Sequence, residues 1–321
     1  MLHEYADLID IRELPAKLND LKWHITGFID GDGSLPIIFS PVPDKRFGWL
    51  IQPRFQIELR NDQDSITMLR IIRRTFSINT DILKGDTYVK LVVTNRRLLL
   101  EKFVPFCRKY RLALKQDDFD LMRSILEALQ EKKHLEETGF KAMIRQIYSS
   151  PSDSEGRRRW SFNDIIPNEQ PPDMHTASNP VFPEGSDLRN YTAGFIDAEG
   201  SLGYAILPDT KTITPYMTVT HQNIAVLRKI QQTIRSGQIS SGRLQMYGVA
   251  NIVEKIVPFL EKHRLIAKRS VYARFKDVLE NVLQRKHKER FGEVERMARS
   301  VNHRGILRDH TLSTNPIQLG K

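Results

Sequence analysis

Cysteine is almost absent from this sequence, in which Cys107 is the only one among 321 residues. A single cysteine excludes an intramolecular disulfide and a zinc site built from cysteines. Cys107 lies in the apolar run LLLEKFVPFC, which favours a buried core thiol over a nucleophile. Long hydrophobic runs are also missing, because no stretch approaches the roughly 18 apolar residues of a membrane span.

Signals for secretion and for organelle import are missing as well. Residues 1–22 are rich in acids, which argues against a transit peptide, and they contain no apolar signal-peptide segment. We therefore expect an intracellular protein, in a prokaryotic cytoplasm or an organelle interior, that makes no membrane contact.

Motifs of nucleotide-binding proteins and of histidine-based zinc sites are also missing. There is no P-loop and no dinucleotide-binding fingerprint, and the nine histidines form no His-x-x-x-His pair.

The charge balance is basic. Lys and Arg number 49 against 39 Asp and Glu, which gives a net charge of +10. Such a balance favours a polyanionic partner, with nucleic acid first and an anionic membrane second. Hydrophobic residues make up 40% of the chain, which is enough to form real cores, and the length allows one large domain or two ordinary ones.

An internal repeat organises the chain. WHITGFIDGDGSL (residues 23–35) aligns without a gap with YTAGFIDAEGSL (residues 191–202), so that Asp32 corresponds to Glu199. The similarity continues in the same order downstream, where FVPFCRKYRLALK in the first half matches IVPFLEKHRLIAK in the second. Repetition over this length indicates two homologous halves.

Each half is predicted to contain a helix, two strands, a helix, two strands and a helix. The strands are indicated by alternation of period two: in RFQIELR (residues 54–60) the polar side chains share one face and Phe55, Ile57 and Leu59 share the other. We expect an α+β chain of two αββαββα halves with antiparallel sheets, related by a pseudo-two-fold axis. The predicted limits are 1–150 for the first repeat, 151–186 for a proline-rich connector that docks partly on the first repeat through WSFNDII, and 187–321 for the second.

Small residues mark one face of each repeated helix. Gly27 and Gly31 are four residues apart, as are Gly194 and Ala198, so each helix carries a stripe along which two backbones can approach closely. We therefore expect the two helices to pack against each other.

This packing would bring Asp32 and Glu199 together at the C-terminal ends of the helices. A carboxylate there meets the negative end of the helix dipole and a second carboxylate, which stability alone does not favour. A lone acid at such a position would be a solvated helix-terminal residue, but a matched pair on a repeat favours binding of a cation such as Mg²⁺, which prefers oxygen ligands. For Asp30 and Asp197 we favour a structural role, in which they cap backbone groups at the helix junction.

The two motifs, ITGFIDGDG (residues 25–33) and TAGFIDAEG (residues 192–200), resemble the signature of the LAGLIDADG homing endonucleases in their monomeric, two-repeat form, and the flanking segments resemble that family too. The resemblance implies a metal-dependent endonuclease that hydrolyses both strands of DNA at a long, asymmetric site. It implies Mg²⁺ (or Mn²⁺) as cofactor, with Asp32 and Glu199 as catalytic metal ligands and the carbonyls of Gly31 and Ala198 as further ligands. It also implies a monomer, because the second half replaces a partner subunit.

In the resemblance, each sheet forms a saddle over the major groove of double-stranded DNA, where polar side chains can read base edges. The predicted DNA-binding residues are Arg46, Gln52, Arg54, Gln56, Glu58, Arg60, Lys84 and Lys90 in the first half and Tyr204, Lys211, Thr218, Thr220, Gln222, Arg243 and Gln245 in the second. Any one of them alone would equally be a solvated strand residue, but the set favours DNA binding. Three further residues either contact phosphates or solvate helix ends: Lys115, Lys268 and Arg269.

The sequence departs from the family at one point. Where family members often keep a Lys or Gln near the catalytic centre, the aligned positions hold Leu59, Thr94, His221 and Tyr247. Two other functions share the scaffold: an RNA maturase that binds its own intron RNA, and a DNA-binding regulator without catalysis. Retention of both acids argues against the regulator, and nothing in the sequence excludes maturase activity beside cleavage.

Overall fold

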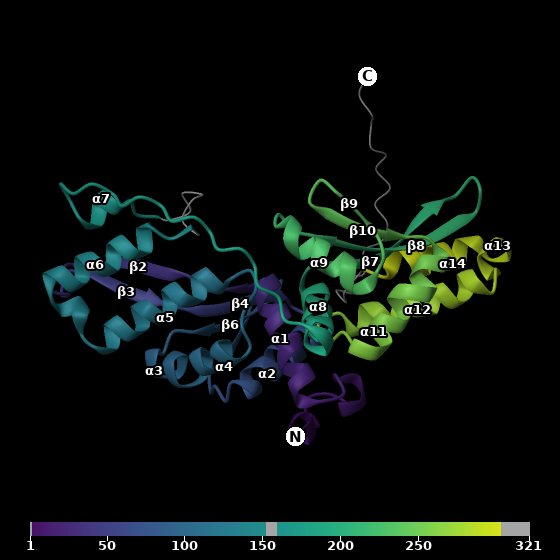
Figure 1. Ribbon diagram of the computed structural model, residues 1–321. Helices are drawn as coiled ribbons and strands as arrows, with labels where there is room; N and C mark the ends of the chain where they lie inside the picture. The colour runs from purple at the N-terminus through teal and green to yellow at the C-terminus, as the bar shows by residue number, and fades with distance from the viewer. Residues whose placement is uncertain (1, 152–158, 303–321) are drawn as a thin grey trace.

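The computed structural model describes residues 2–151 and 159–302. Two similar halves meet at a central pair of long helices, α1 (Leu18–Asp32) and α8 (Gly185–Glu199), which lie side by side in Figure 1. The other elements of the first half and the connector are η1 (Leu2–Tyr5), η2 (Ile11–Glu13), β1 (Gly33–Ser34), β2 (Ile37–Pro41), β3 (Trp49–Pro53), β4 (Phe55–Arg60), α2 (Gln63–Thr75), β5 (Ile82–Lys84), β6 (Tyr88–Val93), α3 (Arg96–Leu98), η3 (Leu99–Phe103), α4 (Val104–Lys109), α5 (Gln116–Gln130), η4 (Lys133–Leu135), α6 (Glu137–Tyr148) and α7 (Phe162–Ile165).

The second half repeats this order. Its elements after α8 are β7 (Gly200–Leu207), β8 (Thr212–Thr220), α9 (Ile224–Ile234), β9 (Gln238–Ser240), β10 (Arg243–Tyr247), α10 (Val249–Asn251), η6 (Ile252–Ile256), α11 (Val257–His263), α12 (Arg269–Leu283), α13 (Lys286–Glu289) and α14 (Phe291–Ser300). The predicted α+β architecture with antiparallel sheets is confirmed. None of the helices in the part of the chain that the structure describes is both long and apolar enough to cross a membrane.

The two sheets have the same topology. Their strand orders are β1-β4-β6-β5 and β7-β8-β10-β9, and all neighbours are antiparallel. The register also repeats, because the glycine after each motif helix pairs with an equivalent strand residue: Gly33 with Ile57 and Gly200 with Val219. The repeat in the sequence is therefore a repeat in structure, including the position of each sheet relative to its motif helix.

One difference between the sheets lies in the first half, where both long strands are interrupted. Pro36 separates β1 from β2 and Arg54 separates β3 from β4, so that β2 and β3 form a two-stranded extension. Proline lacks the N–H that a ladder needs, and Arg54 N donates across the break to Pro36 O at 2.9 Å. The predicted strand over residues 54–60 therefore begins at Phe55, with Phe55 and Ile57 buried and Glu58 and Arg60 exposed.

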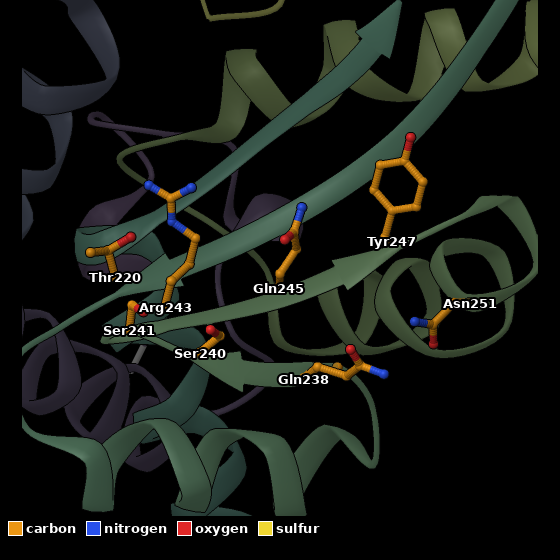
Figure 2. Close-up of a pocket in the computed structure, with 9 residues that line it drawn as sticks. Thr220, Gln238, Ser240, Ser241, Arg243, Gln245, Tyr247 and Asn251 are labelled. Carbon is orange, nitrogen blue, oxygen red and sulfur yellow. The ribbon is translucent and has the colours of Figure 1, made fainter.

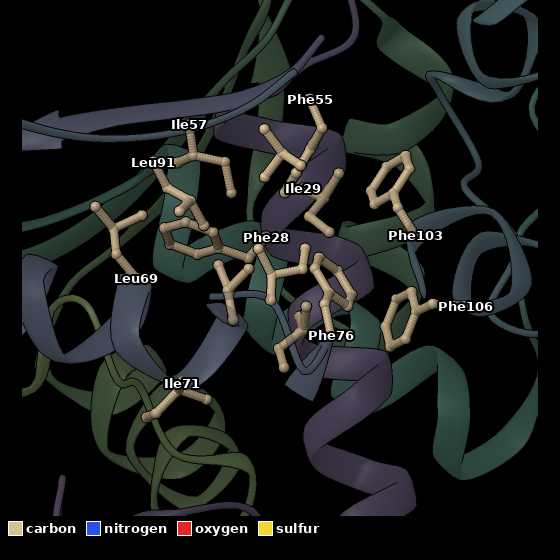
Figure 3. Packing of buried hydrophobic residues seen from close by; sticks show 14 of the residues in the cluster. Phe28, Ile29, Phe55, Ile57, Leu69, Ile71, Phe76, Leu91, Phe103 and Phe106 are labelled. Atoms are coloured by element: carbon tan, nitrogen blue, oxygen red, sulfur yellow. The ribbon is translucent and has the colours of Figure 1, made fainter. Parts of the chain in front are cut away.

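The main cores lie between each sheet and its helices. Figure 3 shows Phe28 and Ile29 of α1 packed toward Phe55 of β4 and Leu91 of β6, all fully buried. Each such side chain contributes about 1.5–3 kcal/mol on burial, so the motif helix is held firmly under its sheet. Cys107 is buried in the same cluster as predicted, and burial raises the pKa of its thiol well above the ordinary value.

A third cluster joins the β2–β3 extension to α5, α6 and α7. Phe162 and Ile165, from the WSFNDII segment expected to dock on the first half, are buried in it. Ser161 begins α7 with a capping box to Asp164, which fixes this end of the connector. Residues 152–158 of the predicted connector lie outside the described residues.

Candidate active site and nucleic-acid interface

The motif helices touch through their backbones. A Cβ atom placed on Gly27 would lie 1.9 Å from the carbonyl oxygen of Tyr191, and one on Gly194 would lie 1.8 Å from that of His24. Only glycine leaves room for this approach, since a backbone carbonyl cannot move aside as a flexible side chain can. The expected packing of the two small-residue stripes is confirmed.

The C-terminal ends of the helices adjoin as well. A Cβ atom on Gly31 would lie 2.4 Å from Ala198 Cβ and 3.3 Å from Glu199 Cγ. This contact brings the motif-final acids, Asp32 and Glu199, to one place. The pKa of Asp32 is raised to about 6, first by burial and also by the charge of Glu199, although Lys268 and Lys115 oppose the shift.

Two lysines hold the helix ends. Lys115 Nζ donates to the carbonyl oxygens of Ile29 at 3.0 Å, Asp30 at 2.6 Å and Gly31 at 2.7 Å. In the second half, the equivalent Lys268 Nζ donates to the carbonyls of residues 196, 197 and 198. Burial lowers the pKa of Lys115 although Asp30, Asp32 and Glu199 oppose the shift. Neither role expected for these lysines specified this contact, in which each ammonium caps the end of a motif helix.

Arg269 fulfils neither expected role. Its guanidinium lies 2.6 Å from Glu13 and 3.2 Å from Asp64, and both acids belong to the first half. Asp64 also accepts a hydrogen bond from Ser270 N at 2.7 Å. Arg269 therefore joins the two halves through these ion pairs. The structure shows this contact in place of the expected contact with phosphate or solvation of a helix end.

The other motif acids are buried caps, as expected. Asp30 accepts from the backbone N–H groups of residues 113, 114 and 115 at 2.6–3.2 Å, and Asp197 accepts from those of residues 266, 267 and 268 at 2.8–2.9 Å. Each also contacts the opposite helix, because the Tyr191 hydroxyl lies 2.9 Å from Asp30 and His24 Nε2 lies 3.1 Å from Asp197.

The two caps differ in their titration. Burial raises the pKa of Asp30. Burial acts in the same sense on Asp197, but the hydrogen bond and the charge of His24 outweigh it and lower the pKa of that carboxyl. His24 and Tyr191 occupy equivalent positions in the repeat, so a crossed pair of contacts joins the halves beside the motif-final acids.

The residues at the helix ends suit a hard divalent cation in their chemistry. The donors are two carboxylates and two helix-terminal carbonyls, and the raised pKa of Asp32 shows that its negative charge is poorly compensated there. Within residues 2–151 and 159–302, no group of three or more His, Cys, Asp or Glu side chains is placed to hold a metal. A cation at this point would therefore take its remaining ligands from water or from a bound phosphodiester.

The first sheet carries polar side chains along its outer face, many of them in contact with each other. Arg54 donates to Gln52 Oε1 at 2.9 and 2.5 Å, and Lys90 lies 3.0 Å from Glu58. The other predicted residues of this half also lie on the surface: Gln56 is half-buried in β4, Arg60 and Lys84 are exposed at strand ends, and Arg46 is exposed in the turn between β2 and β3, over the ring of Phe47.

The second sheet carries a groove of about 910 Å³. Its lining residues come from β8, β9, β10, α10 and the positions on either side of β9, and are Thr220, Gly237, Gln238, Ser240, Ser241, Arg243, Gln245, Tyr247 and Asn251 (Figure 2). Three of them were predicted: Thr220, Arg243 and Gln245. Gln238 and Ser240 were not predicted, because β9 is too short to show alternation clearly, although its pairing beside β10 brings both into the groove. Asn251, which ends α10, was not predicted either.

The other predicted residues of the second half divide into three cases. Thr218 is half-buried beside Gln245, Gln222 is exposed after β8, and Lys211 lies exposed in the β7–β8 turn. Tyr204 is a correction, because it pairs with Pro215 on the core face of the sheet and is only 8% exposed. Its hydroxyl donates to Phe275 O at 2.5 Å, so it cannot reach a base. The alternation of Leu202, Tyr204 and Ile206 already indicated this inward face.

The positions aligned with the family's auxiliary groups are chemically varied. Leu59 is half-buried against the core, Thr94 is exposed and Tyr247 lines the groove. His221 packs 5.4 Å from the ring of Phe195, and its Nδ1 accepts from Asn223 N at 3.0 Å. Burial first and then the charge of Lys115 lower the pKa of His221. None of these four positions therefore places a Lys or Gln side chain near the candidate centre, as family members often do.

Comparison with known proteins gives a consistent result. A family model described as LAGLIDADG endonuclease matches residues 25–139. The probable intron-encoded endonuclease 2 of Neurospora crassa is 24% identical over 82% of this chain and 60% of its own length, and the probable intron-encoded DNA endonuclease 1 of Mycosarcoma maydis is 20% identical over 79% of this chain and 97% of its own. The chain thus spans about three fifths of the first of these relatives.

Solved structures show the same fold. The I-LtrWI LAGLIDADG homing endonuclease bound to target DNA matches 90% of this chain and 100% of its own with a TM-score of 0.76 and 20% identity. I-SmaMI bound to an uncleaved DNA target in the presence of calcium ions matches 88% of this chain and 99% of its own, with a TM-score of 0.77 and 18% identity.

Proposed function

Because this chain belongs to the LAGLIDADG family in its single-chain, two-repeat form, we propose that it is a site-specific DNA endonuclease that cuts both strands of a long, asymmetric target. The observation that carries the proposal is the meeting of Asp32 and Glu199 at the ends of two helices whose backbones are in contact. A protein that only bound nucleic acid would have no use for two carboxylates that oppose each other's charge.

In this proposal Asp32 and Glu199 hold Mg²⁺ or Mn²⁺, and the carbonyls of Gly31 and Ala198 complete the protein ligands. When bound, such an ion supplies an activated water and stabilises the charge that develops on the phosphate and the leaving oxygen. The chain's own groups fix the geometry, because Lys115 and Lys268 hold the helix-terminal carbonyls and place positive charge beside the acids. A carbonyl oxygen has two lone pairs, so it can accept from a lysine and still face a cation.

Each half contributes one acid, and this suits cleavage of one strand by each half. The centre is formed by α1 and α8 of one chain, so we propose a monomer with pseudo-two-fold symmetry. Double-stranded DNA would lie along the outer faces of both sheets. The polar side chains of the first sheet and those that line the groove on the second sheet would then enter the major groove of the DNA. Such a target lies inside a prokaryotic cytoplasm or an organelle, where we place the protein.

The test measures binding and cleavage separately. The I-SmaMI complex in the presence of calcium ions contains uncleaved DNA, so Ca²⁺ is the condition for binding and Mg²⁺ for cleavage. We expect the wild type to cut its selected site in Mg²⁺, and Asp32→Asn and Glu199→Gln to bind that site in Ca²⁺ without cutting both strands. Glu289→Gln, which removes an exposed charge in α13, is the matched control and should cut normally.

The proposal fails if the wild type binds a specific DNA but never cuts it in Mg²⁺ or Mn²⁺. Saturable binding to intron RNA in preference to DNA would instead identify a maturase. Loss of cutting in Glu289→Gln as well as in Asp32→Asn would show that charge removal in general, rather than the paired acids, is responsible.

A further inference from the structure

We propose that the second half reads a guanine through Arg243 and, one step farther from the cleavage centre, an adenine through the neighbouring pair Gln245 and Gln238. This inference rests on the proposed function, because it assigns part of the target sequence of the same DNA-binding surface. It follows from the register of the second sheet and from the charge of its groove.

The register places these residues in rows across the sheet. Arg243 pairs with Thr220 on one side and Ser240 on the other. Gln245 pairs with Thr218 and Gln238, two residues farther along β10. Paired residues share a face, so each row presents one set of side chains to a ligand above the sheet. Figure 2 shows Arg243 and Gln245 projecting from β10 on the same side of the sheet.

The same register orders the rows by distance from the candidate cleavage centre. Gly200, which follows Glu199 directly, pairs with Val219, so the row of Thr220 and Arg243 lies next to the end of α8. The row of Gln245 is two residues away, or roughly 7 Å along the strand. Since successive nucleotides on one DNA strand are about 3.4 Å apart, the two rows address positions about two base pairs apart.

The charge of the groove limits what each row can read. Among the described residues that line it, Arg243 alone is charged, and the rest are glycine, hydroxyl, amide and phenol groups. Both cross-strand neighbours of Arg243 are uncharged. The first half differs at the equivalent place, where Lys90 faces Glu58 at 3.0 Å. No carboxylate lies across the strand from Arg243, so its guanidinium can give its donors to a base.

The position of β10 favours base edges over phosphates. This strand lies between β8 and β9, so its side chains project from the inner part of the sheet and away from its rim. An arginine so placed makes a bidentate contact with O6 and N7 of guanine, and a glutamine makes one with N6 and N7 of adenine. The first half carries Lys90 and Val92 at the positions equivalent to Arg243 and Gln245, so the two half-sites cannot be the same.

The experiment is a binding selection in Ca²⁺ from a pool of double-stranded DNA randomised over the whole site, followed by sequencing. We expect a G·C pair near the centre in one half-site and an A·T pair about two steps outward. Arg243→Gln should change the first preference from guanine to adenine, and Gln245→Arg should change the second from adenine to guanine. Each change should shift the base ratio at that position roughly tenfold to a hundredfold and leave the other half-site unchanged.

Arg228→Gln is the matched control, since it removes one exposed arginine from α9 without touching the sheet face, and it should leave every base preference unchanged. The inference is overturned if the wild type cuts a specific site while Arg243→Gln and Gln245→Arg leave the preference at all positions unaltered. If both variants switch preference in Ca²⁺ but the wild type never cuts in Mg²⁺, the reading of bases stands and the proposed nuclease function fails.

Discussion

Replacing Asp32 with asparagine should stabilise the metal-free protein at neutral pH while it abolishes cleavage. The reason is the raised pKa of Asp32, which is about 6 in the folded chain against an ordinary value of 3.8. A carboxyl whose pKa is raised by folding is held most favourably in its protonated form. Its contribution to stability is fully present below about pH 4 and is lost as the pH rises through 6. Above pH 6 the full cost of the buried charge remains.

The size of this cost follows from the shift. Each pKa unit corresponds to about 1.36 kcal/mol, so the change from 3.8 to about 6 amounts to a cost of about 3 kcal/mol at pH 8. The Asp32 side chain is half-buried, so solvent screens part of this cost. We therefore expect Asp32→Asn to raise the free energy of unfolding at pH 8 by about 2 kcal/mol. For a chain of this size that gain corresponds to a rise in Tm of roughly 3 °C.

The assay is thermal unfolding of wild type and Asp32→Asn in a chelating buffer at pH 8 and at successively lower pH. The gap in Tm should be largest at pH 8 and should narrow between pH 6 and pH 4. Adding Ca²⁺ should reverse the order, because the wild type gains about 2.7 kcal/mol at a free metal concentration 100 times its Kd and the variant gains less.

Asp197→Asn is the matched control with the opposite sign. Its carboxylate accepts three backbone N–H groups and contacts His24, and its pKa is lowered, so removing the charge should reduce Tm at pH 8. The reasoning is refuted if Asp32→Asn unfolds at or below the wild-type temperature at pH 8 without metal, or if its Tm gain does not depend on pH.

Three further substitutions test the packing. Gly27→Ala puts a Cβ 1.9 Å from a backbone oxygen of α8, so it should cost about 2 kcal/mol or more and cut DNA poorly, whereas Gly292→Ala, which meets nothing within 4 Å, should not lower the urea midpoint. Tyr204→Phe should cost about 1 kcal/mol in urea unfolding, through its lost buried hydrogen bond, and leave base preference in the binding selection unchanged. Arg269→Gln should cost about 1–2 kcal/mol by leaving Asp64 without its cation, and rescue of the midpoint in the double variant with Asp64→Asn would identify that contact as the cause.

The features of the fold that could be predicted from the sequence are those whose residues repeat at a short spacing along the chain. The spacing of Gly27 and Gly31 predicted the close approach of the helices, because residues four apart share a helix face whatever the rest of the chain does. The alternation around Ile57 predicted a strand with one polar face, because successive residues of a strand point to opposite faces of the sheet. The repeat then doubled each local signal, which made the pairing of Asp32 with Glu199 visible without any structure.

The parts that could not be predicted depend on contacts between distant segments. Lys115 reaches the carbonyls of α1 across 84 to 86 positions, and Arg269 meets Glu13 across 256. Neither contact leaves a trace in local periodicity. The Tyr204 error has a different origin, because the alternation was present but the residue was assigned to the polar face by its type.

The structure explains how the chain tolerates a site that its own stability opposes. Asp30 and Asp32 stand two residues apart on one helix, yet the first is caged by backbone N–H groups and the second is left beside another acid. The segment that cages Asp30 ends in Lys115, whose ammonium holds the carbonyls of the same helix end. Residues 113–115 thus hold the end of α1 in two ways, because they donate to the carboxylate of Asp30 and to the carbonyls of the last helical residues. Because these contacts need no metal, the end of the helix is held in place without one, and Asp32 keeps an unfavourable charge that the proposed cation would compensate.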